Sequence, residues 1–279
     1  MYEIYQKIVA EHKKELDKAI NEDYKSTEQE LEILVEKAVN ETGKKEREAN
    51  KLITSLVLAL WLRNGKSITK TSKALMNDTW LFYEFIAAQK LNVPSTILTN
   101  KQISKMVDKI YKERCKMIKW DKVLNGNARR TNRKIKNIVK QGLKKGKTTR
   151  QIQADIQKRM KIDRNKAKMI ADNEVNFYRA ETKIQVAKHQ TDLTVIKTWI
   201  YTFRSKEPRV HHKRAGESHQ VAIGVYGLFE INGHKTIAPQ HFGIASEDIN
   251  CKCDYKMEYA QEVNTTQGEF NKYKEGKNE

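Results

Sequence analysis

Apolar residues recur at helical spacing up to about residue 190 and alternate with polar residues beyond it. Steps of three and four residues place apolar side chains on one face of a helix, whereas strict alternation is typical of a half-buried strand. The spacing therefore predicts helices over 2–20, 27–42, 44–62, 67–91, 99–124, 126–145, 148–161 and 163–190.

Two of these helices begin at recognisable capping residues. Thr148 followed by Gln151 is a capping-box pattern, in which each side chain bonds the other residue's amide. Asp163 is placed to accept hydrogen bonds from the first free amides of the helix that follows it. Both positions are therefore predicted helix starts.

The same two helices carry apolar stripes that can pack. One stripe consists of Ile152, Ile156 and Met160, and the next consists of Ile170, Phe177, Ala180, Ile184 and Ala187. Asn173 and Glu174 lie beside the second stripe. They need polar partners if they are buried, and they need none if they lie at its wet edge.

The last part of the chain has strand and turn signals. LTVIKTWIYTF, from Leu193, is rich in β-branched and aromatic residues and predicts a strand with one face formed by Val195, Trp199, Tyr201 and Phe203. Asn232-Gly233 between VYGLFEI and HKTIA predicts a hairpin with a tight two-residue turn. The polar, aperiodic end predicts a mobile tail.

These elements predict an α+β protein: a mainly helical N-terminal two-thirds, then a small α+β C-terminal domain with a β-hairpin. The expected organisation is a helical region, a basic helical segment, a C-terminal domain and a polar tail, over 1–95, 96–147, 148–260 and 261–279.

The composition shows that the excess positive charge is concentrated in one part of the chain. The chain has 279 residues and a net charge of +19, and residues 101–170 hold 24 Lys and Arg against five acidic residues. The rest of the chain is balanced, with 30 basic and 30 acidic residues. The basicity therefore points to a local binding surface rather than to general solubility.

The densest part of this segment, residues 128–150, contains no acidic residue. Like charges on one helix repel, and a solvated structural face would intersperse Glu to form i,i+4 pairs. Double-stranded DNA, contacted through its phosphates without sequence preference, is the favoured partner over a merely solvated face. The alternative is a purely structural assembly adaptor, whose charge meets an acidic surface of the portal and not DNA. The predicted DNA-binding residues are Arg129, Arg130, Arg133, Lys134, Lys136, Lys140, Lys144, Lys145, Lys147 and Arg150.

Several function classes are disfavoured. No aromatic residues interleave with these bases, which argues against stacking on single strands, and the segment lacks the apolar aromatic face of a membrane-surface helix. The longest apolar run, 52–62, is too short for a membrane span. We find no Walker loop, zinc-finger spacing or secretory signal, and three cysteines make no disulfide framework, so we expect an intracellular origin.

Histidines and cysteines gather late in the chain, at His211, His212, His219, His234, His241, Cys251 and Cys253. Thiolate and imidazole suit zinc, so one interpretation is a zinc site of Cys251, Cys253, His212 and His241; the other is that the cysteines simply pack. A third is an HNH-type nuclease built from His211-His212, Asn232 and His241, although Asn232 is already explained by its turn.

An ordered set of short motifs runs through the same part of the chain. It comprises Ala171-Asp172-Asn173-Glu174, Lys197-Thr198-Trp199, Arg209-Val210-His211-His212, Gly216, Pro239 and Asn250-Cys251-Lys252-Cys253. Over roughly 148–255, this order resembles the Mu F-like minor head proteins of tailed bacteriophages, the phage head morphogenesis family. Two departures are that Lys206-Glu207 replaces the usual acidic position and that His211 competes with His212 as the equivalent histidine.

The resemblance implies a virion component without enzymatic activity, made in the host cytoplasm and carried inside the capsid. The implied partners are the portal protein, packaged DNA and the major capsid or scaffolding protein, with no membrane and no established cofactor. Residues 52–62 are either buried core or a surface for the portal or self-association. The motif residues matched to the family are Glu174, Trp199, Arg209, His212, Gly216, Asn250, Cys251 and Cys253.

Overall fold

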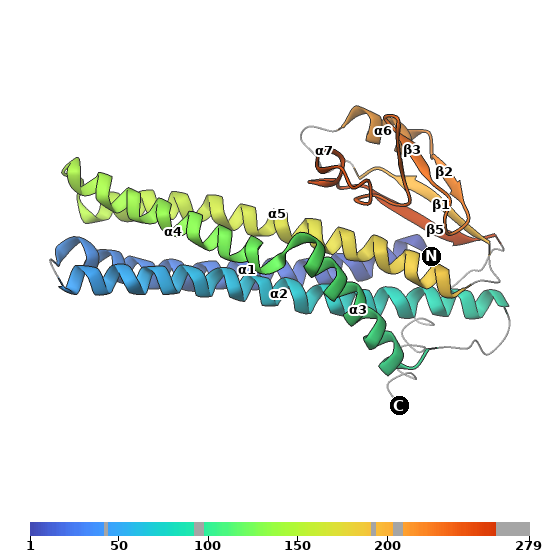
Figure 1. Cartoon of the computed structure of the whole chain (residues 1–279), viewed down its shortest axis with the longest axis horizontal. Coiled ribbons are helices and arrows are strands. Elements are labelled where there is room, and N and C mark those ends of the chain that lie inside the picture. Colours follow the sequence, from blue (N-terminus) through green and yellow to red (C-terminus); the bar gives the residue numbers. More distant parts are fainter. Residues whose placement is uncertain (42–43, 92–97, 191–193, 203–208, 261–279) are drawn as a thin grey trace. The chain divides into compact units, whose positions relative to one another are not determined.

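The computed structural model describes residues 1–41, 44–91, 98–190, 194–202 and 209–260. Five long helices precede a small region of strands and short helices within these ranges, which confirms the predicted α+β class (Figure 1). The helices are α1 (Tyr2–Asn40), α2 (Lys44–Leu91), α3 (Asn100–Ile118), α4 (Trp120–Lys144) and α5 (Thr149–His189). None of the described helices is long and apolar enough to cross a bilayer.

The chain divides into two compact units, each assembled from separate stretches. Unit 1 combines 1–13, 71–112 and the region from 172 onward, and unit 2 combines 14–70 with 113–171. The predicted ranges 1–95, 96–147 and 148–260 were drawn from charge and motifs, whereas the two units are defined by contacts. The predicted ranges therefore stay a prediction. The predicted tail, 261–279, lies outside the described residues.

Three predicted helix breaks are wrong, because α1, α2 and α5 each run through the polar residues that suggested an interruption. In α1, buried Tyr24 continues the apolar repeat between Ile20 and Leu31. In α2, Gly65 lies against Leu124 of α4 so closely that an added Cβ would meet its side chain at 2.5 Å. Both polar stretches therefore carry packing residues that an apolar count does not register.

Asp163 is not a helix cap, which corrects the third break. It lies inside α5, is almost fully buried and accepts hydrogen bonds from Arg159 one turn earlier, at 3.0 Å and 2.6 Å. The predicted break between 124 and 126 is wrong as well, because α4 runs through it; the chain breaks instead at Lys119, which adopts a left-handed conformation, φ 53°, between α3 and α4. The capping box at Thr148 and Gln151 is confirmed by both of its hydrogen bonds.

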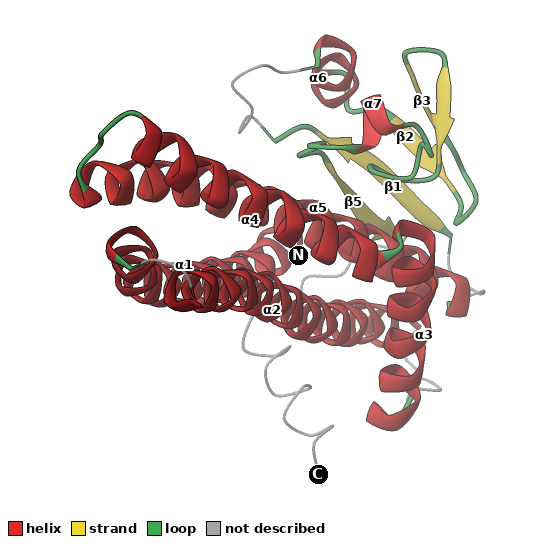
Figure 2. Cartoon of the chain, turned by 60° about the vertical axis from the view of Figure 1, so that its left-hand side comes forward, coloured by secondary structure: helices red, strands yellow, loops and turns green. Residues whose placement is uncertain are grey.

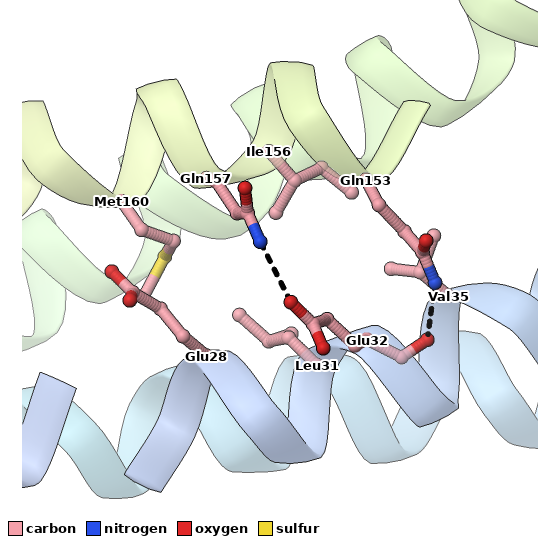
Figure 3. Close-up of a pocket in the computed structure, with 8 residues that line it drawn as sticks. All are labelled: Glu28, Leu31, Glu32, Val35, Gln153, Ile156, Gln157 and Met160. Carbon is pink, nitrogen blue, oxygen red and sulfur yellow. Dashed lines mark hydrogen bonds between the residues drawn. The ribbon is translucent and has the colours of Figure 1, made fainter. Parts of the chain in front are cut away.

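The core of unit 2 lies along apolar stripes of its helices. The predicted stripe of α5, Ile152, Ile156 and Met160, is fully buried. Figure 3 shows two of these side chains facing Leu31 and Val35 of α1, with Gln157 donating to Glu32 at the edge of the seam. The space left between them is about 10 Å³, roughly one water molecule, so this seam is core rather than a ligand site.

Unit 1 contains a three-stranded antiparallel sheet in the order β2-β1-β5, drawn with the short helices in Figure 2. Its strands are β1 (Val195–Ile200), β2 (Val221–Ile223) and β5 (Asp254–Tyr259). The prediction of β1 is confirmed, with Val195 and Trp199 buried; Tyr201 follows the strand, and Phe203 lies outside the described residues.

The predicted hairpin is also confirmed. It joins β3 (Phe229–Ile231) to β4 (His234–Thr236), with Asn232 at φ 54° and Gly233 at φ 74°. Positive φ at both central residues is the geometry that an Asn-Gly turn supplies.

A buried ionic group joins the end of α5 to β5 within unit 1. Lys183 donates to Asp254 at 3.0 Å, and Arg179 lies 3.4 Å from the same carboxylate. Burial alone would raise the pKa of Asp254, but the two cations hold it far below its ordinary value. The predicted stripe of α5 is buried at Ala180, Ile184 and Ala187, while Ile170 and Phe177 are half-buried.

Candidate functional site

His212, Cys251 and Cys253 meet in the interior of unit 1. His212 comes from α6 (Val210–Glu217), and the two cysteines lie in the extended segment that enters β5. The Nδ1 atom of His212 lies 3.6 Å from the sulfur of Cys251 and 3.5 Å from that of Cys253, and all three side chains are buried. We refer to these residues as the His-Cys cluster.

Local chain geometry explains why both cysteines face the same way. Residues two apart in an extended segment point to the same side, and the intervening residue points to the other. Lys252 accordingly pairs with Asp172 at 2.6 Å, away from the sulfurs. The spacing Cys-x-Cys therefore delivers two thiols to one point.

Trp199 of β1 and Phe242 hold the histidine ring in place. The Trp199 ring packs edge-on against His212 with centroids 5.6 Å apart, and Phe242 stacks on the histidine at the same separation, 5.6 Å. Because Trp199 is fully buried in the sheet core, it fixes the ring on a rigid support.

Glu247 supports the other nitrogen of the ring. It lies in the short helix α7 (Ala245–Asp248), is buried, and accepts from Nε2 of His212 at 2.8 Å and of His211 at 3.0 Å. Burial acts to raise the pKa of Glu247, but these two hydrogen bonds lower it below its ordinary value. An ionised carboxylate only accepts, so Nε2 of His212 carries a proton, and Nδ1 of the same ring faces the two sulfurs.

The two thiols influence each other's ionisation. A hydrogen bond from Cys253, together with His212, lowers the pKa of Cys251 to about 5. The same sulfur contact and burial raise the pKa of Cys253. Contact between the two sulfurs therefore shifts their pKa values in opposite directions.

A hollow of about 220 Å³ opens beside the cluster and is lined by polar and apolar atoms in similar measure. Besides the three cluster residues, its lining comprises Tyr201, Arg209, Asn250 and Lys252. Arg209 donates to the backbone oxygens of Glu247 at 2.9 Å and Ile249 at 2.6 Å, which anchors α7 at the rim. The cluster is therefore buried from three sides and approachable from the fourth.

Other motif residues hold the surrounding chain. Gly216 lies so close to Tyr201 that an added Cβ would be 2.3 Å from its Cβ. The Lys197 ammonium is buried and donates to the backbone oxygens of Val225, Gly227 and Ile237. Burial lowers the pKa of Lys197 to about 8. These residues thus act by positioning loops.

For Asn173 and Glu174 the sequence left two alternatives open, burial with polar partners or a place at the wet edge of the apolar stripe. The side-chain oxygen of Asn173 accepts from the backbone amide of Asn250 at 3.1 Å, which ties α5 to the Asn250-to-Cys253 stretch. Asn250 itself has a left-handed backbone, φ 59°. Glu174 is buried, so the alternative that placed it at a wet edge is wrong for this residue.

His241 does not belong to the cluster, which corrects the predicted ligand set. Its Nε2 pairs with Glu181 of α5 at 2.9 Å, and its Nδ1 bonds the oxygen of Pro239. The described residues form metal-compatible groups only from His212 with Cys251 and Cys253, and from His211, His212 and Glu247. The HNH-type arrangement is not assembled either, because Asn232 is an exposed turn residue and His241 is engaged elsewhere.

The predicted DNA-binding residues lie mostly on α4, in unit 2. Nine of the ten are exposed, and Lys147 is half-buried and paired with Asp155 at 2.5 Å. Five of them recur by steps of four, three, four and four residues, which places them on one helix face: Arg129, Arg133, Lys136, Lys140 and Lys144. The opposite face is buried and includes Leu124, Ile135 and Val139. We call this the basic stripe.

Residues 133–256, which include most of the basic stripe and the whole His-Cys cluster, match the family described as phage Mu protein F like protein. This part of the chain is a Mu F-like region. The resemblance inferred from the ordered motifs is therefore confirmed, and the match extends from the middle of the basic stripe to β5.

One curated relative is similar over part of this chain. It is an NAD(+)–arginine ADP-ribosyltransferase, EFV, from Enterococcus faecalis, 28% identical over 121 residues, which are 43% of this chain and 24% of that enzyme. The chain thus spans about a quarter of the relative's length. No solved structure matches the chain.

The sequence patterns did not reveal Glu247 as the hydrogen-bond partner of His212. Its helix, α7, has four residues, which is too short for an apolar repeat to reveal. The available signal was an acidic residue three positions before Asn250, close to the motif cysteines.

Proposed function

We propose that this Mu F-like protein is a minor head protein of a tailed bacteriophage, carried inside the capsid, that contacts packaged double-stranded DNA through the basic stripe. The family match supports a role in head morphogenesis. The observation that carries the DNA contact is the exposure of nine basic side chains around α4.

The charge of α4 has few partners in its own helix. Asp121 is the one acidic residue between Trp120 and Lys144, and the exposed face of the stripe holds none. An internal structural role would pair these cations with carboxylates, as α5 does at Arg159 and Asp163. Phosphate groups outside the protein are the complementary charge, because each neutralised phosphate releases condensed counterions.

The geometry of the stripe suits a duplex backbone. A helix of 25 residues is about 37 Å long, which is about the length of one turn of DNA. The stripe presents flexible Lys and Arg side chains and no aromatic residue to stack on a base. The contact it makes is therefore with phosphates and does not read sequence.

DNA binding as a function of salt tests the proposal. We expect the full-length protein to bind unrelated duplexes equally, with an affinity that falls steeply between 50 and 200 mM salt. Replacing Arg129, Arg130, Arg133 and Lys134 by Gln should reduce the slope of log K against log salt by about three to four units. Fluorescence anisotropy with a labelled duplex measures both quantities.

A matched control separates position from net charge. Lys14, Lys18, Lys25 and Lys37 are also exposed and lie on α1 in unit 2, so their replacement by Gln removes the same charge elsewhere. We expect this control to keep the wild-type slope. Equal effects of the two variants, or an unchanged slope in the first, would overturn DNA contact by the stripe.

The portal, as the site where the protein enters the head, is part of this proposal, and an enzymatic role is not proposed. The transferase relative is similar over 24% of its own length, so its name says little about this chain. Co-purification with the portal and protection inside assembled particles would test location. A protein found only outside the capsid would contradict it.

A further inference from the structure

The His-Cys cluster has the composition and geometry of a metal site. We propose that His212 Nδ1 and the sulfurs of Cys251 and Cys253 bind one zinc ion, whose fourth position faces the hollow. This site is separate from the basic stripe and does not depend on DNA binding. The described residues bring together the three protein ligands in one buried place.

The two separations between the histidine nitrogen and the sulfurs match zinc coordination. Zinc binds sulfur at about 2.3 Å and imidazole nitrogen at about 2.0–2.1 Å, so a tetrahedral angle places the two ligand atoms about 3.5–3.6 Å apart. The observed separations from Nδ1 to the sulfurs are 3.5 Å and 3.6 Å. The side chains therefore already stand at the distances that a bound ion requires.

The partner of the other histidine nitrogen supports the same conclusion. Histidines that bind zinc usually donate their second N–H to a carboxylate, which fixes the tautomer and makes the ligating nitrogen more basic. Glu247 accepts from Nε2 of His212 at 2.8 Å and is itself buried. The arrangement carboxylate, histidine and two sulfurs is thus complete except for the ion.

Simple packing of the cysteines explains less. Buried thiols behave as small apolar groups and need no ring nitrogen facing them. Here a histidine, held by Trp199 and oriented by a carboxylate, presents its Nδ1 to both sulfurs. The alternative group of His211, His212 and Glu247 is already satisfied by hydrogen bonds of 3.0 Å and 2.8 Å, so the sulfur side is the better site.

The fourth ligand is a water molecule in this proposal. The hollow of about 220 Å³ is large enough for several waters and offers polar partners at Tyr201 and Asn250. Zinc with three protein ligands commonly keeps an open position of this kind. Binding converts both thiols to thiolates, and the protons leave to solvent.

Elemental analysis of full-length protein, purified without chelators from zinc-supplemented cultures, tests the site. We expect about one zinc ion per chain, and at least a tenfold loss in Cys251→Ser, Cys253→Ser and His212→Ala. Cys115→Ser and His241→Ala are the matched controls and should keep their zinc. Cys115 is a free cysteine outside the cluster, and His241 is paired with Glu181.

Two further measurements protect the test against variants that misfold. Wild-type protein stripped by a chelator should take up one cobalt ion and show the thiolate charge-transfer and intense visible bands of tetrahedral Co²⁺. Glu247→Gln should keep the ligands and bind zinc about 10 to 100 times more weakly. Wild-type protein with less than a tenth of an equivalent of zinc and no cobalt spectrum would overturn the site, as would equal zinc loss in Cys115→Ser.

Discussion

Charged side chains are used in opposite ways in the two units. In unit 1, Asp254, Arg179 and Lys183 are buried and contact one another. In unit 2, the cations of the basic stripe are exposed, and α4 holds one acidic residue. The first arrangement fixes the fold from inside, whereas the second leaves charge available to an external anion.

The difference shows that the net charge of +19 says little about where a partner binds. A buried cation with carboxylate and carbonyl partners contributes to that number but offers nothing to DNA. A row of exposed cations on one helix face offers a continuous positive surface. Function therefore follows from which charges lack internal partners.

The largest expected effect concerns the buried ionic group. Asp254→Asn should lower the free energy of unfolding by about 3–5 kcal/mol, because it leaves two buried cations without their carboxylate. Asp155→Asn removes a half-exposed ion pair with Lys147 and should leave the free energy of unfolding nearly unchanged. Urea denaturation measures the free energy of unfolding of both variants. Equal losses would contradict the special importance of the buried ionic group.

The same carboxylate predicts how stability depends on pH. The pKa of Asp254 lies far below its ordinary value in the folded protein, whereas in the unfolded chain it is about 4. Its contribution is therefore complete above the unfolded pKa and is lost as the pH falls through the folded pKa. We expect the stability gap between wild type and Asp254→Asn to narrow from pH 6 to pH 3. A gap that widens on acidification would contradict this assignment.

Two glycines sharpen the comparison at the level of packing. An added Cβ at Gly216 of unit 1 would be 2.3 Å from the Cβ of Tyr201, so Gly216→Ala should cost about 1–3 kcal/mol. At Gly126 of α4 the nearest atom is 3.9 Å away, so Gly126→Ala should stabilise by about 0.5–1 kcal/mol through helix propensity. Thermal melts should give opposite signs, and shifts of the same sign would show that the two surroundings do not differ as described.

Sequence patterns predicted the local features of the fold well. The Asn232-Gly233 turn and the capping box at Thr148 were confirmed because each depends on residues a few positions apart. Tyr24 and Asp163 were misjudged because their roles depend on burial and on a partner across a turn. The sequence of a helix does not reveal whether its polar side chains are buried and hydrogen-bonded by distant parts of the chain.

The candidate zinc site was predicted in part for the same reason. The structure brings Cys251 and Cys253 close to His212, as the candidate set required, while zinc binding itself stays a prediction. His241 was included on residue type alone, yet it pairs with Glu181, sixty positions away. Glu247 was missed because its place beside the histidines depends on tertiary folding. Residue chemistry names candidates, and only distances between chain-distant atoms select among them.

The smallest expected effect on stability tests the stripe itself. Replacing Arg129, Arg130, Arg133 and Lys134 by Gln should change the free energy of unfolding by no more than about 0.5 kcal/mol, because these side chains are exposed. The described contact of Arg130 with Asn127, 2.8 Å, is one that Gln can lose at small cost, and relief of repulsion among the cations acts in the opposite direction. Wild type should also gain more stability from added salt than the variant does, since salt screens the same repulsion. A loss above about 1 kcal/mol in denaturant titrations would mean that the stripe serves the fold, and the contrast with the buried charges of unit 1 would no longer hold.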